Sequence, residues 1–172
     1  ASPAGDSIPA MIAAGAICEI ATAAGSREIA VEDFVVGVGR NALAPGEFLL
    51  GLKLAMPSAE TKDAYLRFTP RTEMDIAVAG VGVSLTVAGG RCTQARVAIG
   101  AVAPTAMLVP EAAEALIGTD LNDTALHQAG EECKAAASPI SDKSGTAEYR
   151  KKVVAVLCRR AIVVAHQRIQ GA

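Results

Sequence analysis

The sequence predicts an α+β fold, with strands gathered before helices rather than alternating with them. Short alternating stretches bounded by glycines fill much of the N-terminal part, as strands do. Gly89-Gly90 separates two long apolar runs, which is typical of a tight turn between antiparallel strands. Residues 145–169 then carry apolar side chains at helical spacing, so we expect a long C-terminal helix.

The N-terminal part is expected to form a short helix followed by three strands. Asp6 or Ser7 is a suitable cap for the helix, because a short polar side chain can accept from its first free amides. Gly25 lies between two alternating stretches and indicates a hairpin. The expected elements are a helix over residues 7–14, strands over 16–23 and 27–31, a loop over 32–46 and a strand over 47–55.

The C-terminal part is expected to form an antiparallel three-stranded sheet with packed helices. The turn at Gly89-Gly90 makes the strands a meander, and the strand before it has small side chains on one face. Asn122 and Thr146 provide caps for the last two helices. The expected elements are strands over residues 63–69, 76–88 and 92–103 and helices over 110–117, 122–137 and 145–169.

The last helix is predicted to have one apolar and one basic side. The apolar side consists of Tyr149, Val153, Val156, Leu157, Ala161 and Val164. The cations are expected mostly elsewhere, at Arg150, Lys151, Lys152, Arg159 and Arg168. A solvated face is the simpler interpretation of these cations than a nucleic-acid surface, since the whole chain has a formal net charge of -2.

The composition excludes several kinds of protein. The 172 residues are just over half apolar, which is enough for a buried core and for one domain or one and a fraction. No apolar run reaches the roughly 18 residues that a membrane span needs, so none is expected. The four cysteines lack Cys-x-x-Cys spacing and are expected to be buried or half-buried thiols of a cytosolic protein, without a metal site. No nucleophile lies in a Gly-x-Ser-x-Gly elbow, which argues against a hydrolase.

Three motifs have residues that could bind a ligand. Residues 37–42 fit Gly-x-Gly-x-x-Ala, but Pro45 and Gly46 prevent the helix that a dinucleotide site needs, so we interpret them as an ordinary loop. Residues 70–75 place a guanidinium and two carboxylates between apolar strands, and a functional loop and a solvated turn are equally supported. Asp6 can cap its helix or accept from a ligand hydroxyl, and the residues alone favour the cap.

Several stretches together resemble the flavoprotein, or medium, subunit of molybdenum hydroxylases. The similarity is greatest to the aerobic carbon monoxide dehydrogenase type and more distant to the FAD domain of xanthine dehydrogenase. The matching stretches occur in the family's order and span almost the whole chain. They are residues 1–10 (ASPAGDSIPA), 45–50 (PGEFLL), 64–68 (AYLRF), 71–77 (RTEMDIA), 139–150 (PISDKSGTAEYR) and 157–161 (LCRRA).

The resemblance implies a division of the chain and a role for it. Residues 1–57 would be the end of an FAD-binding domain, and residues 60–172 a carbon monoxide dehydrogenase flavoprotein C-terminal-like domain. Such cytoplasmic subunits carry FAD and take electrons from [2Fe-2S] clusters on an iron–sulfur small subunit. A molybdopterin large subunit feeds those clusters, and the flavin passes the electrons to NAD, oxygen or a quinone.

The resemblance also implies cofactor-binding residues. Asp6 would hydrogen-bond the FAD, which replaces the cap interpretation, and Leu49 would pack near the flavin ring. Arg67 stands where the family usually has a Lys that contacts FAD. Arg71, Asp75 and Ile76 would belong to a loop beside the isoalloxazine, although the carbon monoxide dehydrogenase type has an aromatic residue at the position of Ile76. No general acid or base is expected on this chain.

One part of the family pattern is missing from this sequence. The family holds the FAD pyrophosphate with two glycine-rich loops, and neither is present, so the chain looks N-terminally truncated. We therefore expect it to bind FAD weakly or not at all by itself. The alternative is a non-catalytic fragment or assembly module of the same hetero-oligomeric complex.

Overall fold

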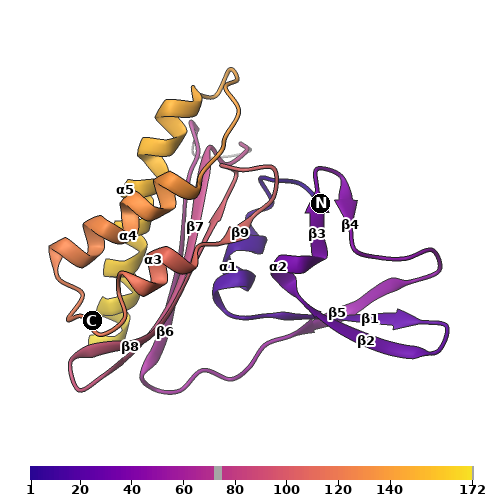
Figure 1. The fold of residues 1–172 in the computed structure, drawn as a ribbon, viewed down its shortest axis with the longest axis horizontal. Coiled ribbons are helices and arrows are strands. Elements are labelled where there is room, and N and C mark those ends of the chain that lie inside the picture. The colour runs from indigo at the N-terminus through magenta and orange to yellow at the C-terminus, as the bar shows by residue number, and fades with distance from the viewer. Residues whose placement is uncertain (72–74, 172) are drawn as a thin grey trace.

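The computed structural model describes residues 1–71 and 75–171 and confirms the α+β class (Figure 1). Its helices are α1 (Ser7–Ala13), α2 (Val31–Phe34), α3 (Pro110–Glu114), α4 (Asp123–Ala136) and α5 (Ala147–Gln170). Its strands are β1 (Ile17–Thr22), β2 (Gly25–Ala30), β3 (Val35–Gly37), β4 (Arg40–Asn41), β5 (Phe48–Lys53), β6 (Thr61–Phe68), β7 (Ala79–Ala88), β8 (Arg91–Gly100) and β9 (Met107–Leu108).

The described strands form three antiparallel sheets. The first has the order β2-β1-β5, the second is the hairpin β3-β4, and the third has the order β6-β7-β8-β9. The third sheet was predicted with three strands and has four. Its extra strand β9 pairs only Met107 and Leu108 with β8, and two residues are too short to show an alternating pattern in the sequence.

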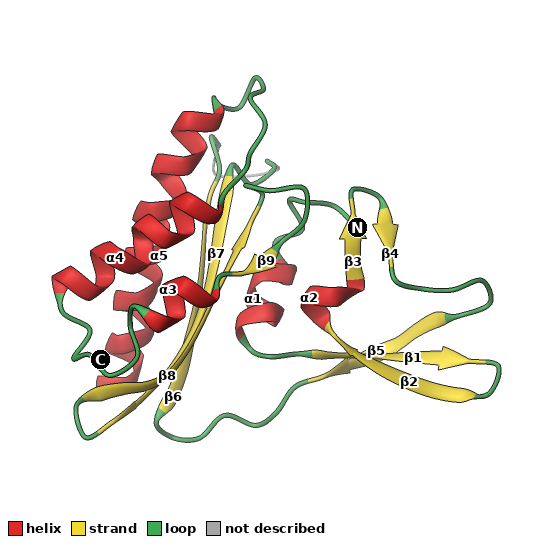
Figure 2. Cartoon of the chain, viewed as in Figure 1, coloured by secondary structure: helices red, strands yellow, loops and turns green. Residues whose placement is uncertain are grey.

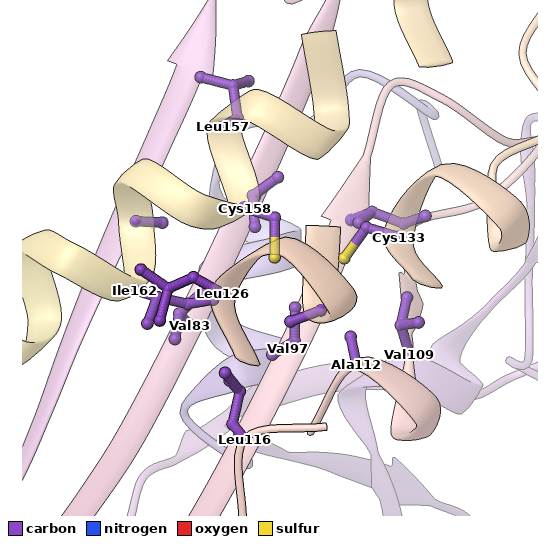
Figure 3. Packing of buried hydrophobic residues seen from close by; sticks show 14 of the residues in the cluster. Val83, Val97, Val109, Ala112, Leu116, Leu126, Cys133, Leu157, Cys158 and Ile162 are labelled. Carbon is purple, nitrogen blue, oxygen red and sulfur yellow. The ribbon is translucent and has the colours of Figure 1, made fainter. Parts of the chain in front are cut away.

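The four-stranded sheet has helices on both faces (Figure 2). On one face α5 packs against β6 and β7, while α4 packs on α5 and α3 on β8. The core between them contains Val83 and Val97 from the sheet and Ile162 from α5, all inaccessible to solvent (Figure 3). Each such side chain contributes about 1.5–3 kcal/mol by leaving water. Cys133 and Cys158 lie in the same core, and all four cysteines are buried and free, as predicted.

Helix α1 lies on the opposite face of this sheet and comes unusually close to it. A Cβ at Gly82 would stand 2.4 Å from the carbonyl oxygen of Pro9, and a Cβ at Gly100 would stand 2.4 Å from Cγ of Pro9. Only glycine fits at such positions, so these two residues permit the approach. The far end of α1 is held by Arg96, which donates from Nη2 to the Ile12 carbonyl at 2.9 Å.

Most predicted elements of the N-terminal part are confirmed, with one correction. The hairpin β1-β2 and the strand β5 lie where they were expected. Residues 32–46, predicted as a loop, also contain the end of α2 and the small hairpin β3-β4. The glycines of the Gly-x-Gly-x-x-Ala stretch lie in and beside that hairpin, and no helix follows them, as Pro45 and Gly46 led us to expect.

The predicted apolar side of α5 is confirmed for Leu157 and Ala161, which are buried, and for Val153 and Val164, which pack against the core, but not for its first turn. Tyr149 is 43% exposed, whereas Arg150, expected toward solvent, is only 5% exposed. Helical periodicity located the helix correctly, and the misplaced cation is Arg150, whose guanidinium has acceptors inside the protein. The side chains of Asn122 and Thr146 accept from the amides of Ala125 and Tyr149, as their predicted cap roles require.

No helix in the described part of the chain has both the length and the apolar character needed to cross a membrane.

Candidate functional site

The N-terminal turn meets the end of strand β6 through the carboxylate of Asp6. Tyr65 donates from its hydroxyl to Oδ1 of Asp6 at 3.1 Å, and Arg67 donates to Oδ2 and forms an ion pair. Tyr65 and Arg67 are two residues apart on β6, so both side chains project from the face that carries α1. Asp6, Tyr65 and Arg67 therefore form one polar cluster, although Tyr65 and Arg67 lie 59 and 61 positions after Asp6 in the sequence.

Asp6 does not cap α1, so the expectation from the residues alone is wrong. It occupies the N-cap position, but its backbone is already helical and its side chain makes no cap hydrogen bond. Its carboxylate is directed to Tyr65 and Arg67 instead. A charged hydrogen-bonding partner on a neighbouring strand outweighs a local amide here, because hydrogen bonds between charged groups are the stronger ones.

Tyr65 fits into this cluster because β7 leaves room for it. A Cβ at Gly80 would lie 2.8 Å from the Tyr65 hydroxyl, and glycine avoids that clash. Half-burial of the ring, followed by the nearby Asp6 carboxylate, raises the pKa of the Tyr65 phenol well above its usual value. The phenol therefore remains a hydrogen-bond donor throughout the physiological range.

A second polar group lies in the connection between β6 and β7. Arg71 donates from Nε to Oδ2 of Asp75 at 3.1 Å, and the amide of Ile76 donates to Oδ1 at 2.9 Å. These two hydrogen bonds, with Arg71 the larger cause, lower the pKa of Asp75 and keep it ionised. Ile76 is 71% exposed beside this carboxylate. The second predicted carboxylate, Glu73, lies outside the described residues.

Leu49 is placed apart from the other candidate residues. It lies on β5, which pairs with β1 in the three-stranded sheet, whereas Arg67 belongs to the four-stranded sheet. Figure 1 shows β5 on the far side of α1 from the four-stranded sheet. Leu49 is 39% exposed, and it belongs to an exposed apolar stretch along the free edge of its sheet. The stretch consists of Phe48, Leu49, Leu50, Leu52, Leu54 and Met56.

The described residues fit the chemistry of a flavin nucleotide. The Asp6 carboxylate can accept from a hydroxyl, and the side chain of Arg67, 43% exposed, can face a phosphate or carbonyl oxygen. Ile76 and Leu49 offer exposed apolar surface to an aromatic ring. The structure brings Asp6 together with Arg67 from separate parts of the sequence, whereas Arg71 and Asp75 pair within one loop, four residues apart.

Sequence reasoning missed Tyr65 as a member of the site. Its signal was present, since period two puts Tyr65 on the same face of β6 as Arg67. The glycines of β7 gave a second signal, because small residues on one face of a strand indicate that something packs closely there. What could not be read from the sequence was that the N-terminal turn is the segment that comes close.

Comparison with known families covers nearly the whole chain. Residues 64–165 match the CO dehydrogenase flavoprotein C-terminal domain, and residues 1–57 match the FAD binding domain in molybdopterin dehydrogenase.

Individual relatives show the same pattern. The chain is 35% identical over 168 residues to the carbon monoxide dehydrogenase medium chain of Afipia carboxidovorans, covering 97% of this chain and 58% of the relative. It is 32% identical to the nicotine 6-hydroxylase medium subunit of Paenarthrobacter nicotinovorans, with 92% and 55% covered.

Solved structures agree with these matches. Reconstituted CO dehydrogenase from Oligotropha carboxidovorans superposes with a TM-score of 0.92 at 34% identity, covering 97% of this chain and 58% of that one. Quinoline 2-oxidoreductase from Pseudomonas putida 86 gives a TM-score of 0.88 at 27% identity, with 98% and 58% covered. The chain thus spans somewhat more than half the length of the relatives it matches. It belongs to the family of the CO dehydrogenase flavoprotein C-terminal domain.

Proposed function

We propose that this chain is part of the FAD-carrying electron-transfer subunit of a cytoplasmic molybdenum hydroxylase. Its partners would be an iron–sulfur small subunit and a molybdopterin large subunit, and the electrons would leave the flavin for NAD, oxygen or a quinone. The observation that carries the proposal is the Asp6, Tyr65 and Arg67 cluster. It joins a turn within the FAD-binding match to a strand of the C-terminal domain match, which is the arrangement expected of a ligand site between two parts of a protein.

The residues of this chain would bind and orient the flavin. When bound, FAD supplies the redox chemistry, accepting and releasing electrons. Asp6 would accept a hydrogen bond from the cofactor, with its orientation fixed by Tyr65, and Arg67 would provide a cation beside it. Ile76 would exclude water from the ring, and Leu49, on the separate three-stranded sheet, would offer apolar surface from the other part of the chain. We also propose that residues 1–57 and 60–172 form the two parts between which the cofactor lies.

The loop between β6 and β7 would tune the flavin. A carboxylate near a flavin disfavours additional negative charge, and Arg71 offsets this effect because it pairs with Asp75. Replacing Asp75 by alanine in the FAD-loaded subunit should therefore raise the flavin midpoint potential and change the kinetics of the electron acceptor.

The matched control is Asp63→Ala. This carboxylate is also ion-paired, to Arg168, but it is more exposed than Asp75 and lies near the opposite end of β6. If Asp75→Ala leaves the potential and the acceptor kinetics as unchanged as the control does, the proposed role of the loop is wrong.

FAD binding by the chain alone is expected to be weak. Backbone amides of glycine-rich loops supply much of the grip on a diphosphate, and the sequence of this chain lacks the two that the family uses. A purified chain should therefore come out colourless and take up FAD only at high concentration. A yellow preparation with stoichiometric FAD would overturn this expectation.

A second candidate function is a non-catalytic assembly module of the same complex. The exposed apolar stretch of β5 favours it, since five of its side chains are between 39% and 60% exposed and Met56 is 93% exposed. Flavin absorbance of the assembled complex distinguishes the two candidates. A complex that contains this chain, lacks flavin and still transfers electrons would support the assembly module.

A further inference from the structure

A single buried cation lies where several loops meet at one end of the four-stranded sheet. Arg150, in the first turn of α5, is 5% exposed and is the one buried charged residue in the described part of the chain. Its guanidinium donates in two directions. Nη1 reaches two backbone carbonyls, and Nη2 reaches both carboxylate oxygens of Asp142 at 2.8 Å. Burying such a charge is unfavourable unless hydrogen bonds compensate for it, and here Nη1 and Nη2 have partners while the buried Nε has none among the described residues. The placement of this cation therefore calls for an explanation.

The first carbonyl lies at the base of the loop between β6 and β7. Nη1 of Arg150 donates to the carbonyl of Val78 at 2.8 Å, and this bond is buried. The amide of Val78 donates to the carbonyl of Phe68 at 2.8 Å, which closes the loop that contains Arg71 and Asp75. Arg150 therefore fixes the point where this loop returns to the sheet.

The second carbonyl belongs to Ala101, whose backbone carbonyl and amide bind two different parts of the chain. Nη1 of Arg150 lies 3.4 Å from its carbonyl oxygen, and its amide donates to the carbonyl of Pro3 at 2.8 Å. Ala101 has a φ of 63°, a left-handed conformation that is unfavourable for a residue with a Cβ and persists where surrounding contacts hold it. Through Ala101, the same guanidinium is linked to the turn that ends in Asp6.

Asp142 completes this arrangement from the loop before α5. It binds Arg150 in a bidentate manner and also accepts from the amide of Ser144 at 2.8 Å. The Arg150 guanidinium, more than the Ser144 amide, lowers the pKa of Asp142, so the pair stays ionised at neutral pH. A planar guanidinium suits this site because it can serve a carboxylate and two carbonyls from one rigid group, which an ammonium cannot do.

We propose that Arg150, anchored by Asp142, is a positioning residue that holds the two flavin-facing segments of this chain, the turn before α1 and the loop between β6 and β7, in register with each other. The inference rests on the proposed function, since these segments carry Asp6 on one side and Arg71 and Asp75 on the other. Arg150 acts through backbone carbonyls and touches no reacting atom.

Hydrogen exchange of the flavin-free chain tests the coupling directly. In Arg150→Met, the amides of Val78 and Ala101 should both exchange about tenfold faster, as loss of hydrogen bonds to a charged group predicts. The amides of Val83 and Val97, paired in the middle of β7 and β8, should keep their protection. The matched control is Lys152→Met, which removes a cation from the same helix where it pairs with exposed Glu148. Faster exchange at only one of the two reporting amides overturns the proposal.

Asp142→Asn serves as a milder variant in case Arg150→Met unfolds the whole chain. It removes the ionic anchor and leaves the arginine, so Val78 and Ala101 should still lose protection together, by a smaller factor. Unchanged exchange at both amides would overturn the proposal.

A second experiment tests the effect of Arg150 on the flavin and uses the FAD-loaded subunit. Arg150→Met should weaken FAD binding about tenfold and alter the visible circular dichroism of the bound flavin, and Lys152→Met should change neither. Arg150→Lys keeps the charge but should fail to restore either property, because an ammonium lacks the planar fork. Wild-type affinity and spectrum in Arg150→Met would overturn the positioning role even if the two amides are coupled. A wild-type subunit that binds no FAD would refute the proposed function, and the amide exchange would still decide whether Arg150 couples the segments.

Discussion

The close approach of α1 to the sheet is open to a direct test at Gly82. Its φ is not in the left-handed region, so alanine can adopt the backbone, and the only obstacle is the new Cβ. That atom would lie 2.4 Å from the carbonyl oxygen of Pro9, 2.7 Å from the Pro9 carbonyl carbon and 3.0 Å from the amide nitrogen of Ala10. All three neighbours are backbone atoms and cannot rotate away. The whole of α1 must therefore retreat by about 1 Å to restore ordinary contact.

The expected result is a clear loss of stability. Overpacking of this kind costs about 1–3 kcal/mol, and the displaced Asp6 would weaken its hydrogen bond with Tyr65, worth about 1 kcal/mol more. For a chain of this size, each kcal/mol lowers Tm by roughly 2–4 °C. Urea unfolding at neutral pH and a thermal melt, both followed by circular dichroism, measure the two quantities.

Gly51→Ala is the matched control for Gly82→Ala. Gly51 is also a strand glycine without a left-handed φ, and a Cβ there would have nothing within 4 Å. Replacing it should be neutral or stabilising by up to about 1 kcal/mol, since alanine restricts the unfolded chain. Unfolding free energies of the two variants that agree within about 0.5 kcal/mol would refute the claim that the sheet and α1 meet through Gly82.

Three further predictions concern titratable groups. Arg27, and then the amide of Ala44, lower the pKa of Glu47 from 4.5 to about 2, so its contribution to stability is complete above pH 4.5 and is lost as the pH falls toward 2. Glu47→Gln should flatten the fall in Tm between about pH 6 and pH 3, and equal slopes for variant and wild type would contradict this. Burial and the Asp6 carboxylate raise the pKa of Tyr65 above 10, so the stability of the folded protein should decline as the pH rises past about 10. The decline should be less steep in Tyr65→Phe, and urea unfolding of both proteins at about pH 9 and pH 11 measures the difference. The four buried thiols should react with a thiol reagent only after unfolding, because the folded protein keeps the reagent away from them, and rapid labelling of the native protein would show otherwise. The contact with Cys158, and then burial, also raises the pKa of the Cys133 thiol.

Local patterns in the sequence were sufficient for most elements. Period two and glycine turns located the strands, and helical spacing with Asn122 and Thr146 as caps located the long helices. These signals are local, because each depends on residues within one or two turns of the chain. The two-residue strand β9 lacked such a signal and was missed.

The candidate site was predictable only in part, through family resemblance. Asp6, Arg67, Arg71, Asp75 and Ile76 came from matching stretches, and their roles toward a flavin remain predictions. On local grounds Asp6 was expected to cap a helix, and the structure shows it bound to Tyr65 and Arg67 instead. The Asp6 carboxylate could bind either a nearby helix amide or a cation distant in the sequence, and the choice depends on which segments lie together in the folded chain.

What the sequence by itself determined is the order and type of the main elements, since these follow from short-range periodicity, turns and caps. What only the tertiary structure decided is which charges are inside and what they hold. Arg150 was assigned to the solvated side of its helix and is instead buried against carbonyls of Val78 and Ala101. A buried arginine is tolerated only where acceptors converge from several loops, and that convergence exists only once the chain has folded.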